Sequence, residues 1–402
     1  MIAWLSLSDE QRRITLDQAS IRSGIQPKAI EKDWWVTLSL KALFNSKYAK
    51  YCIFKGGTSL SKGWKLIQRF SEDIDIALDP EAFGMEYIPA PSNNYVKKLK
   101  RAGCKFTSEN MTTALVKAFA DLGLPERAIT IEAEEVPATM PDKDPQTINI
   151  RYTSLYDPHP YLADQVKIEF GVRSLKEPFK SIKVNSLLTE FFPNEAYYEI
   201  PFEIPAVEPR KTLLEKAFLL HEKLSYGYPV SIQGDRQSRH LYDLVQLMET
   251  EAGQTALTDV ELYNEIVEHR RYYIRLNGVD YDRLLPLHVS FVPGIEIMQE
   301  FQNDYEAMQT SMIYGPSHDF DELVRRIKIL NGRFRLIGTG LTLEEVIQTA
   351  IKTAGVNTEI KDYKILKIPV ELKLHSGEAV KYQIILLQKG ETLEFENIKI
   401  ID

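Results

Sequence analysis

The sequence predicts an α+β protein with a mixed β-sheet and helices on one side, then a helical region, then a small α+β tail. Three observations support this class. Between residues 51 and 78, a short apolar run, a glycine pair, a helical run and a second apolar run follow one another. The segment QVKIEFGV at 165–172 alternates polar and apolar residues, as a half-buried strand does. From 213 to about 330, apolar residues recur three and four positions apart, which is typical of helices.

Composition indicates a cytoplasmic protein without a membrane partner. The chain has 402 residues, of which 44% are hydrophobic and 26% charged, so two or three globular domains are expected. Two cysteines, Cys52 and Cys104, are too few for a disulfide-stapled secreted protein. Asp9 and Glu10 come too early for a signal peptide, and no stretch approaches the roughly 18 uncharged apolar residues of a membrane span. The net charge of −8 means that a nucleic acid would need local basic patches to bind.

The expected elements follow in chain order. Apolar residues at helical spacing run from Asp9 to about Phe44, and Pro27 is the last proline or glycine in this lead-in. Next we expect a strand at 51–54, a glycine turn at 56–57, a helix at 58–67 and a strand at 74–78. A basic helical stretch at 95–122 precedes strands at 128–136, 147–156 and 165–172.

Prolines mark the expected end of the first domain, because they cannot continue a helix or a central strand. They are Pro193, Pro201, Pro205 and Pro209. Helices are expected at 213–224 and 239–250, and the tail from about residue 341 predicts a helix and strands separated by the turn signals HSGE and QKGET. We therefore expect three domains, at 1–200, 201–335 and 336–402.

The segment DIDI at 73–76 places two carboxylates side by side. Strand periodicity directs Asp73 and Asp75 to one face and the two isoleucines to the other. Neighbouring carboxylates repel each other unless a cation lies between them, and oxygen-only ligands suit Mg²⁺ or Mn²⁺. The alternative is a solvent-facing edge strand whose acids are merely hydrated.

Gly56 and Gly57 stand between a strand and a helix. Glycines at such a junction leave backbone N–H groups open to a phosphate, which the helix dipole also attracts. The Walker spacing is absent, and an ordinary tight turn would explain the glycines alone. A phosphate cradle and a carboxylate pair joined by one helix together indicate phosphoryl or nucleotidyl transfer.

Glu169 is the candidate third acid for such a site. It shares a strand face with Lys167, whereas Ile168 and Phe170 face the other way. Two-metal chemistry needs several acidic ligands. The alternative is an exposed Lys-Glu strand edge.

These motifs resemble the AbiEii/AbiGii-type nucleotidyltransferase toxins, a branch of the DNA polymerase β-like nucleotidyltransferase superfamily. Gly56-Gly57 followed by DID is similar to the superfamily's glycine pair, helix and D-h-D strand, and RFS at 69–71 matches this branch. IEKDWWVTLSLKALF at 30–44 resembles the family's N-terminal helical segment. The resemblance covers roughly residues 10–250 and leaves the tail outside.

Two further helices carry the resemblance. TLLEKAFLLHEKL at 212–224 is similar to the family's "EK" helix, with Lys216 at its characteristic lysine. RHLYDL at 239–244 resembles the family's RDLYDL helix, in which Asp243 matches and His240 stands where an aspartate is usual. His221, on the apolar side of its helix, is expected to be a satisfied, half-buried histidine, because no partner has metal-ligand spacing.

The resemblance implies a function as well as a fold. It implies Mg²⁺- or Mn²⁺-dependent transfer of a nucleotide from an NTP to RNA, in several members to the acceptor end of tRNA. It also implies growth arrest in a type IV toxin–antitoxin system of abortive infection against phage, with a separate antitoxin as partner. Residues 1–200 would hold the nucleotidyltransferase core, and 201–335 a helical domain that closes the active-site cleft.

The resemblance also assigns residue roles. The catalytic residues would be Asp73, Asp75, Glu169, Lys216 and Asp243, of which the first three would be the metal ligands. The NTP-binding residues would be Gly56, Gly57, Thr58, Ser59, Arg69, Ser71 and Lys216.

Plain structural alternatives exist for three of these residues. Arg69 could pair with Glu72. Lys216 could cover apolar surface with its stem. Asp243 could form an i,i+4 pair with Arg239.

Three basic clusters could track an RNA backbone, although each also fits a solvated helix face. Their members are Lys97, Lys98, Lys100, Arg101 and Lys105; Arg270, Arg271, Tyr272, Tyr273 and Arg275; and Arg325, Arg326, Lys328, Arg333 and Arg335.

Other functions remain open at this point. Nucleotidyl transfer to a small molecule or a protein and DxD-dependent sugar transfer would use similar carboxylates. A non-catalytic scaffold with the same fold would bind RNA or a protein partner without chemistry.

Overall fold

A computed structural model describes residues 2–159, 162–225, 236–354, 364–373, 379–389 and 392–401. The chain forms two compact units. Unit 1 comprises Met1–Glu208, Tyr272–Ile274 and Ser311–Pro316, and unit 2 comprises Pro209–Arg271, Arg275–Thr310 and Ser317–Asp402. The division into three domains stays a prediction.

Among the described residues, unit 1 holds a seven-stranded sheet in the order β3-β4-β5-β2-β1-β7-β6. Its strands are β1 (Cys52–Lys55), β2 (Asp73–Leu78), β3 (Ile129–Ala133), β4 (Gln146–Tyr152), β5 (Gln165–Gly171), β6 (Phe179–Val184) and β7 (Phe202–Val207). β2 runs parallel to β5 and β1 parallel to β7, whereas the other neighbours are antiparallel. The predicted mixed sheet and α+β class are therefore confirmed.

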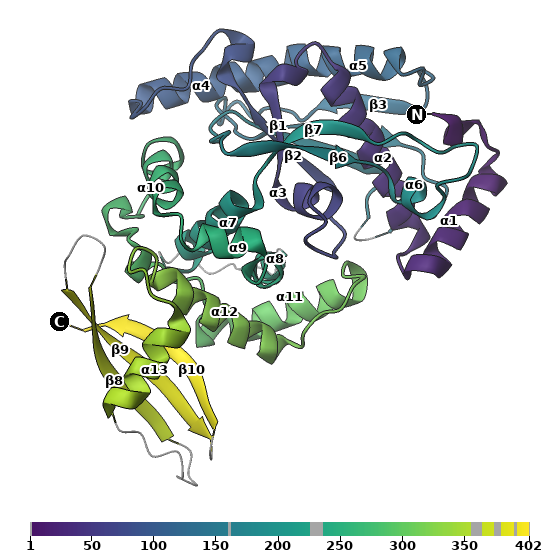
Figure 1. Ribbon diagram of the computed structural model, residues 1–402. Coiled ribbons are helices and arrows are strands. Elements are labelled where there is room, and N and C mark those ends of the chain that lie inside the picture. Colours follow the sequence, from purple (N-terminus) through teal and green to yellow (C-terminus); the bar gives the residue numbers. More distant parts are fainter. Residues whose placement is uncertain are drawn as a thin grey trace. The chain divides into compact units, whose positions relative to one another are not determined.

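Helices cover the apolar face of this sheet (Figure 1). The helices of unit 1 are α1 (Asp9–Ser23), α2 (Pro27–Asn45), α3 (Gly56–Thr58), α4 (Asn93–Phe106), α5 (Thr112–Asp121) and α6 (Leu187–Phe191). Trp34 of α2, Leu99 of α4 and Leu115 of α5 belong to the same buried cluster as Ile74 and Ile168 of the sheet. The isoleucines of DIDI and VKIEFG therefore face the core.

The N-terminal lead-in consists of two helices, because local signals divide it. Ser8 accepts a hydrogen bond from the Gln11 backbone at the start of α1, and the Gln11 side chain bonds back to Ser8. Gly24 ends α1 with φ +73, a conformation that favours glycine, and Pro27 opens α2 at its first position.

The helix expected at 58–67 is shorter than predicted. α3 continues only into one π-helical turn, η3 (Ser59–Gly63). Lys65 has φ +56, which an α-helix does not allow. A Cβ at Gly63 would lie 2.0 Å from Ile182 Cδ1, so β6 packs closely against the end of this turn.

The sequence pattern missed β6 and β7. The prolines around residue 205 predict that no central strand lies there, yet Pro205 lies in β7, between β1 and β6. It stands opposite Ser181 in the ladder with β6, whereas the ladder with β1 pairs only Phe54 with Ala206. A proline fits here because β7 makes only this short pairing on the β1 side.

Unit 2 contains the predicted helical region and tail. Its helices are α7 (Pro209–Ser225), α8 (Ser238–Met248), α9 (Glu251–Ala256), α10 (Val260–His269), α11 (Met298–Ser311), α12 (Phe320–Arg335) and α13 (Leu343–Ala354). The tail strands are β8 (Lys364–Lys373), β9 (Ala379–Lys389) and β10 (Thr392–Ile400). Val346 of α13 and Ile384 of β9 share a buried cluster, so this helix covers one face of the antiparallel β10-β9-β8 sheet.

Two expected features of the tail lie outside the described residues. HSGE falls in 374–378, and two residues of QKGET fall at 390–391. In the described part of the chain, no helix is both long and apolar enough to cross a membrane.

Glu199 gives unit 1 a pH-dependent stability. Its Oε1 accepts a hydrogen bond from Trp34 Nε1 at 3.0 Å, while its Oε2 is buried without a partner among the described atoms. Burial raises the pKa of this carboxyl to about 7, against the smaller lowering effects of Trp34, the N-terminus, Lys41 and Lys62. Because the folded state binds this proton more tightly than the unfolded state, stability falls as pH rises from about 4.5 to about 7, by at most about 3 kcal/mol.

We therefore expect Glu199→Gln to raise the melting temperature at pH 8 and to flatten its dependence on pH. Glutamine keeps an acceptor for Trp34 and removes the buried charge. Thermal unfolding from pH 5 to pH 8 measures the effect, with the exposed Glu10→Gln as a control for the change in net charge. Identical pH profiles for Glu199→Gln and wild type would contradict the assignment.

Candidate functional site

The predicted carboxylates meet on neighbouring strands of unit 1. Parallel β2 and β5 place Asp73 opposite Lys167 and Asp75 opposite Glu169. Side chains alternate along each strand, so all four lie on one face of the sheet. The structure therefore brings the three candidate metal ligands together, with Lys167 beside them.

The charges of these carboxylates affect one another. The pKa of Glu169 is raised to about 7, first by burial and then by the negative charges of Asp75 and Asp73. Lys167 and Lys55 oppose this shift more weakly. The structure thus concentrates negative charge on a partly buried sheet face.

The donor set suits a hard divalent cation. Three carboxylates without histidine or cysteine match the oxygen preference of Mg²⁺ and Mn²⁺, and a cation would relieve their repulsion. In the side-chain conformations of the described residues, no three acidic, histidine or cysteine groups converge on one point as metal ligands. The three residues therefore have the right ligand type and lie on the same sheet face. To bind an ion, their side chains would have to turn toward it.

Gly56 lets the turn after β1 approach the carboxylates. It adopts φ +77, and a Cβ at this position would lie 1.9 Å from Asp75 Oδ2. No other residue type fits without displacing the carboxylate. The first glycine of the pair is therefore explained by its contact with Asp75.

Gly57 and Thr58 contact the RFS loop, residues 69–71. A Cβ at Gly57 would lie 2.5 Å from Arg69 Nη2 and 3.1 Å from Ser71 Oγ. Thr58 Oγ1 donates to the carbonyl of Asp73 and lies 2.9 Å from Ser71 Oγ. The glycine turn, the RFS loop and the start of β2 thus form one connected structure.

Several predicted NTP-binding residues are enclosed by protein. Thr58, Ser59 and Arg69 are 1%, 0% and 2% exposed. Ser59 Oγ donates to the carbonyl of Gly56 at 2.8 Å, and Phe70 N donates to Met312 O at 2.7 Å. These contacts shape the turn and the loop. Glu72 pairs with Lys32 of α2, which fixes the residue just before the carboxylate strand.

A small basic cavity lies beside the RFS loop. Its volume is about 30 Å³, and it is lined by Asp33, Ser61, Lys62, Lys65, Arg69, Phe70, Ser71, Leu187 and Tyr314. The sequence pattern singled out only Arg69 and Ser71 among them. The signal for Lys62 and Lys65 was the stretch SKGWK, but only the fold shows that these lysines turn toward the loop.

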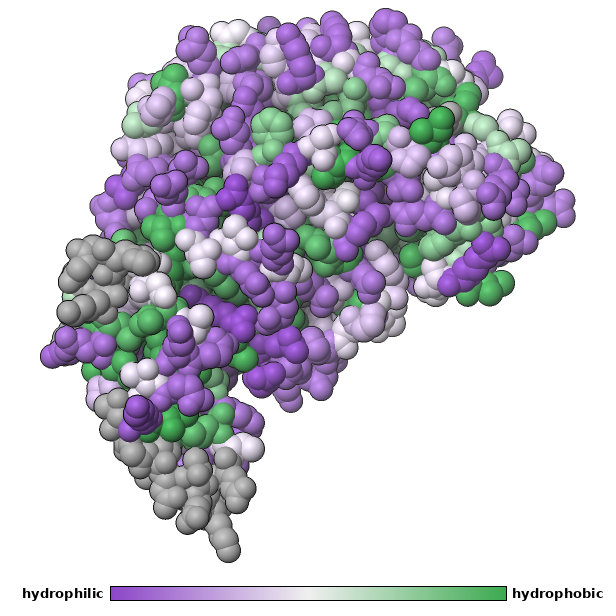
Figure 2. Space-filling model, viewed as in Figure 1, coloured by the Kyte–Doolittle hydropathy of each residue, from purple (hydrophilic) through white to green (hydrophobic). Residues whose placement is uncertain are grey.

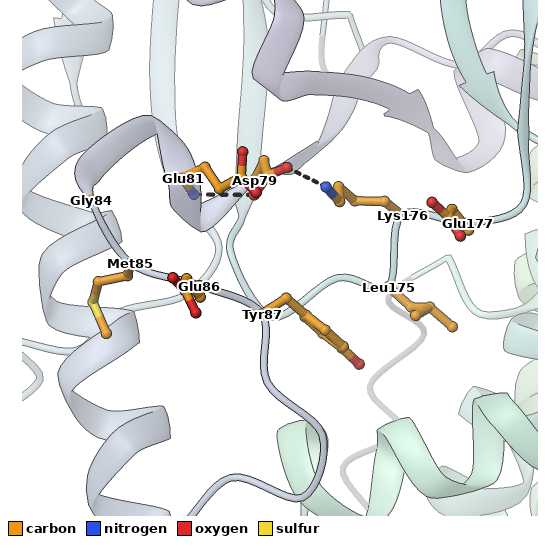
Figure 3. A pocket seen from close by; sticks show the side chains of 9 residues that line it. All are labelled: Asp79, Glu81, Gly84, Met85, Glu86, Tyr87, Leu175, Lys176 and Glu177. Carbon is orange, nitrogen blue, oxygen red and sulfur yellow. Dashed lines mark hydrogen bonds and ion pairs between the residues drawn. The ribbon is translucent and has the colours of Figure 1, made fainter.

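A larger cavity, of about 630 Å³, lies at the other end of the same strands (Figure 3). Its lining residues are Asp79, Glu81, Gly84, Met85, Glu86, Tyr87, Leu175, Lys176 and Glu177. Asp79 follows Asp73 by six positions, or about 20 Å of strand. With four carboxylates and one lysine, itself paired with Asp79, this cavity repels a triphosphate and does not include the carboxylate face. The smaller cavity has the more basic lining of the two, and its volume of about 30 Å³ matches one or two water molecules.

Within unit 2, Lys216 and Asp243 form an ion pair. Lys216 Nζ of α7 lies 2.9 Å from Asp243 Oδ2 of α8 and 3.4 Å from His240 Nδ1. Asp243 is 0% exposed, so its charge is compensated inside the protein. His221 is buried, at 4% exposed, where a half-buried histidine was expected. Its Nδ1 accepts a hydrogen bond from Ser290 N at 3.0 Å.

Gly56→Ala is expected to reduce activity at this site much more than stability. A left-handed φ costs a residue other than glycine about 1 kcal/mol, and the added methyl group must also displace the Asp75 carboxylate. We expect a loss of about 100-fold or more in the rate of nucleotide transfer, with a folded protein. Gly24→Ala is the matched control, because Gly24 has φ +73 and open space around the new Cβ. Equal activity of the two variants would contradict the assigned contact.

Comparison with known proteins gives one match. The family model described as "Nucleotidyl transferase AbiEii toxin, Type IV TA system" matches residues 39–326. None of the curated proteins and none of the solved structures compared with the chain matches it.

Proposed function

The chain belongs to the AbiEii family of nucleotidyl transferase toxins, and from this premise we propose that it transfers a nucleotide from an NTP to RNA in a reaction that depends on Mg²⁺ or Mn²⁺. One observation carries the proposal beyond family membership. Asp75 and Glu169 stand opposite each other on parallel strands, directly beside a turn that only glycine can form. This arrangement supports an ion and a phosphate chain in adjacent positions.

The carboxylates are proposed to bind the metal. Asp73, Asp75 and Glu169 would hold the ion, which when bound would offset phosphate charge and make the α-phosphorus easier to attack. Glu169 would also accept the proton of the attacking RNA hydroxyl. The hydroxyl oxygen would form a bond to the α-phosphorus, and pyrophosphate would leave.

The glycine turn and the RFS loop are proposed to bind the triphosphate. Backbone N–H groups of Gly56 and Gly57 would donate to phosphate oxygens. Ser71 and the Arg69 guanidinium would contribute from the loop, while buried Thr58 and Ser59 support the turn. For Lys216 we propose the role of a point charge for phosphate, oriented by Asp243.

The family also bears on partners. A toxin family of type IV toxin–antitoxin systems implies an antitoxin partner. We propose that the acceptor is the end of tRNA and that the system acts in abortive infection against phage.

The decisive test is a transfer assay with the full chain. Purified protein is incubated with each α-³²P-labelled NTP, Mg²⁺ and total tRNA, then resolved on a denaturing gel, with chelator in parallel. Label on RNA that chelator abolishes and added Mg²⁺ restores is the expected result. If the label appears on a small molecule or on a protein, that molecule and not RNA is the acceptor. Absence of both transfer and NTP binding would favour a non-catalytic scaffold.

A further inference from the structure

The three basic clusters that the sequence predicts as RNA-binding candidates differ in how far their charges are paired with acidic groups. In the second and third clusters, most of the basic side chains that the structure describes pair with acidic side chains. The pairs are Arg270 with Glu222, Arg271 with Asp282, Arg325 and Arg326 with Glu322, Lys328 with Glu396, and Arg333 with Glu249 and Glu344. Arg335 is committed to Asn397 and to the carbonyl of Ile398. These clusters therefore hold unit 2 together and offer little net charge to a ligand.

The aromatic residues of the second cluster are also engaged. Tyr273 is 2% exposed, its ring stacks on Tyr87 at 4.5 Å, and its hydroxyl donates to the carbonyl of Ile88. It is therefore not available for stacking on a base.

The cluster on α4 is different. Lys97, Lys98, Arg101 and Lys105, here called the α4 basic stripe, are all exposed, and none makes an ion pair or side-chain hydrogen bond with a described residue. Only the fifth basic residue, Lys100, is paired, with Asp142 at 2.8 Å. Arg101 adds only a smaller charge effect to the lowered pKa of Asp142, which the hydrogen bond from Lys100 dominates.

The helix geometry aligns these charges. Lys97, Arg101 and Lys105 are four positions apart, so they form a row along one face with about 6 Å of rise between neighbours. Figure 2 shows hydrophilic side chains interspersed with hydrophobic ones on the visible face of unit 1, so the stripe is defined by its residues and their spacing. In a chain of net charge −8, these four cations without acidic partners gather on one helix and give it a local positive charge.

The stripe is also rigidly supported. Ser92 caps the helix by accepting from Tyr95 N, and Leu99 and Phe106 anchor its inner face in the core. Gly103 allows close packing, because a Cβ there would lie 2.4 Å from Val172 Cγ1. The helix backbone that carries the stripe is therefore already in place before an anion binds, so binding need order only the side chains.

The position of the stripe limits the kind of partner. α4 packs on the sheet face that carries Ile74 and Ile168, whereas Asp75 and Glu169 are on the opposite face. A mononucleotide or a short RNA end at the carboxylates therefore cannot reach the stripe. An extended polyanion can contact both.

We propose that the α4 basic stripe binds the phosphate backbone of a folded RNA, at a distance from the end that reacts. Its location and charge follow from the structure, while the choice of RNA as the polyanion rests on the proposed function. The contacts would be to phosphates and would not read sequence.

Binding without NTP tests this proposal independently of catalysis. The probes are fluorescein-labelled total tRNA and a labelled short hairpin, with the full chain and a variant carrying Lys97→Gln, Lys98→Gln, Arg101→Gln and Lys105→Gln. For tRNA we expect the variant to bind at least about 10-fold more weakly near 0.15 M salt. The slope of log association constant against log salt concentration should be less steep by about 3. Binding of the short hairpin should change little.

A second variant with the same change in net charge is the control. Lys117→Gln, Arg325→Gln, Arg326→Gln and Lys389→Gln remove four cations that are already paired with acids, so tRNA binding should stay near wild type. In the transfer assay, the stripe variant should raise KM for tRNA and leave kcat and the KM for NTP unchanged.

Three outcomes would overturn the proposal. One is equal tRNA affinity and salt dependence for the stripe variant and wild type, and another is an equal loss in the control variant. The third is a loss of antitoxin binding with RNA binding intact, which would make the stripe a protein-binding surface. Failure of the proposed function is distinguishable, because it would appear as absence of nucleotide transfer in wild type, whatever the binding results.

Discussion

Asp75→Asn is expected to abolish nucleotide transfer and toxicity while the protein remains folded. Asparagine has nearly the shape of aspartate but lacks the negative charge that would hold a divalent ion. Asp75 stands opposite Glu169 and against the Gly56 turn, so it is central to the candidate site. We expect at least about a 10³-fold lower rate, which corresponds to roughly 4 kcal/mol in the activation free energy.

Three measurements check this prediction. Transfer of label from NTP, growth after induction and the melting temperature are compared for wild type and variant. Removal of one of three repelling charges should leave the melting temperature equal or slightly higher. Asp121→Asn is the control, since Asp121 is an exposed partner of Lys117. A fully toxic Asp75→Asn protein, expressed at the wild-type level, would refute the metal-binding role.

The strand that carries Asp73 and Asp75 could be predicted because its evidence is local. Alternation of acid and isoleucine defines both the strand and its faces within four residues. The pairing of Asp75 with Glu169 could not be predicted in the same way. It depends on the register of two parallel strands that are far apart in sequence, and no periodicity within either strand determines that register.

The missed features have physical reasons as well. Pro205 is compatible with an interior strand only because few residues pair between β7 and β1. The number of paired residues between two strands cannot be deduced from the sequence of either strand. On α2, Lys32 and Asp33 are buried in ion pairs with Glu72 and Lys62. Such pairs join distant segments, so only the fold reveals them. The roles of the site residues stay predictions until the variants are measured.

Asp33→Ala is expected to destabilise unit 1 strongly. Asp33 Oδ1 lies 2.5 Å from Lys62 Nζ, and its Oδ2 accepts a hydrogen bond from Leu187 N at 2.7 Å. Burial lowers the pKa of Lys62, and the charge of Asp33 opposes that shift. Among the described residues, the buried ammonium then keeps only Thr37 Oγ1 and the carbonyl of Asn185 as acceptors. This should cost about 3–5 kcal/mol of unfolding free energy in urea titrations.

The double variant Asp33→Leu, Lys62→Met distinguishes a structural pair from a phosphate-binding one. Replacing both charges with apolar side chains removes the unpaired ion, so the double variant should be more stable than Asp33→Ala. Lys62 also lines the small basic cavity beside Arg69 and Ser71. If Lys62 only supports the fold, the double variant should recover NTP affinity together with stability. Recovered stability with an NTP affinity that stays low would show that the Lys62 ammonium also attracts phosphate. A double variant less stable than Asp33→Ala would contradict the buried-charge explanation.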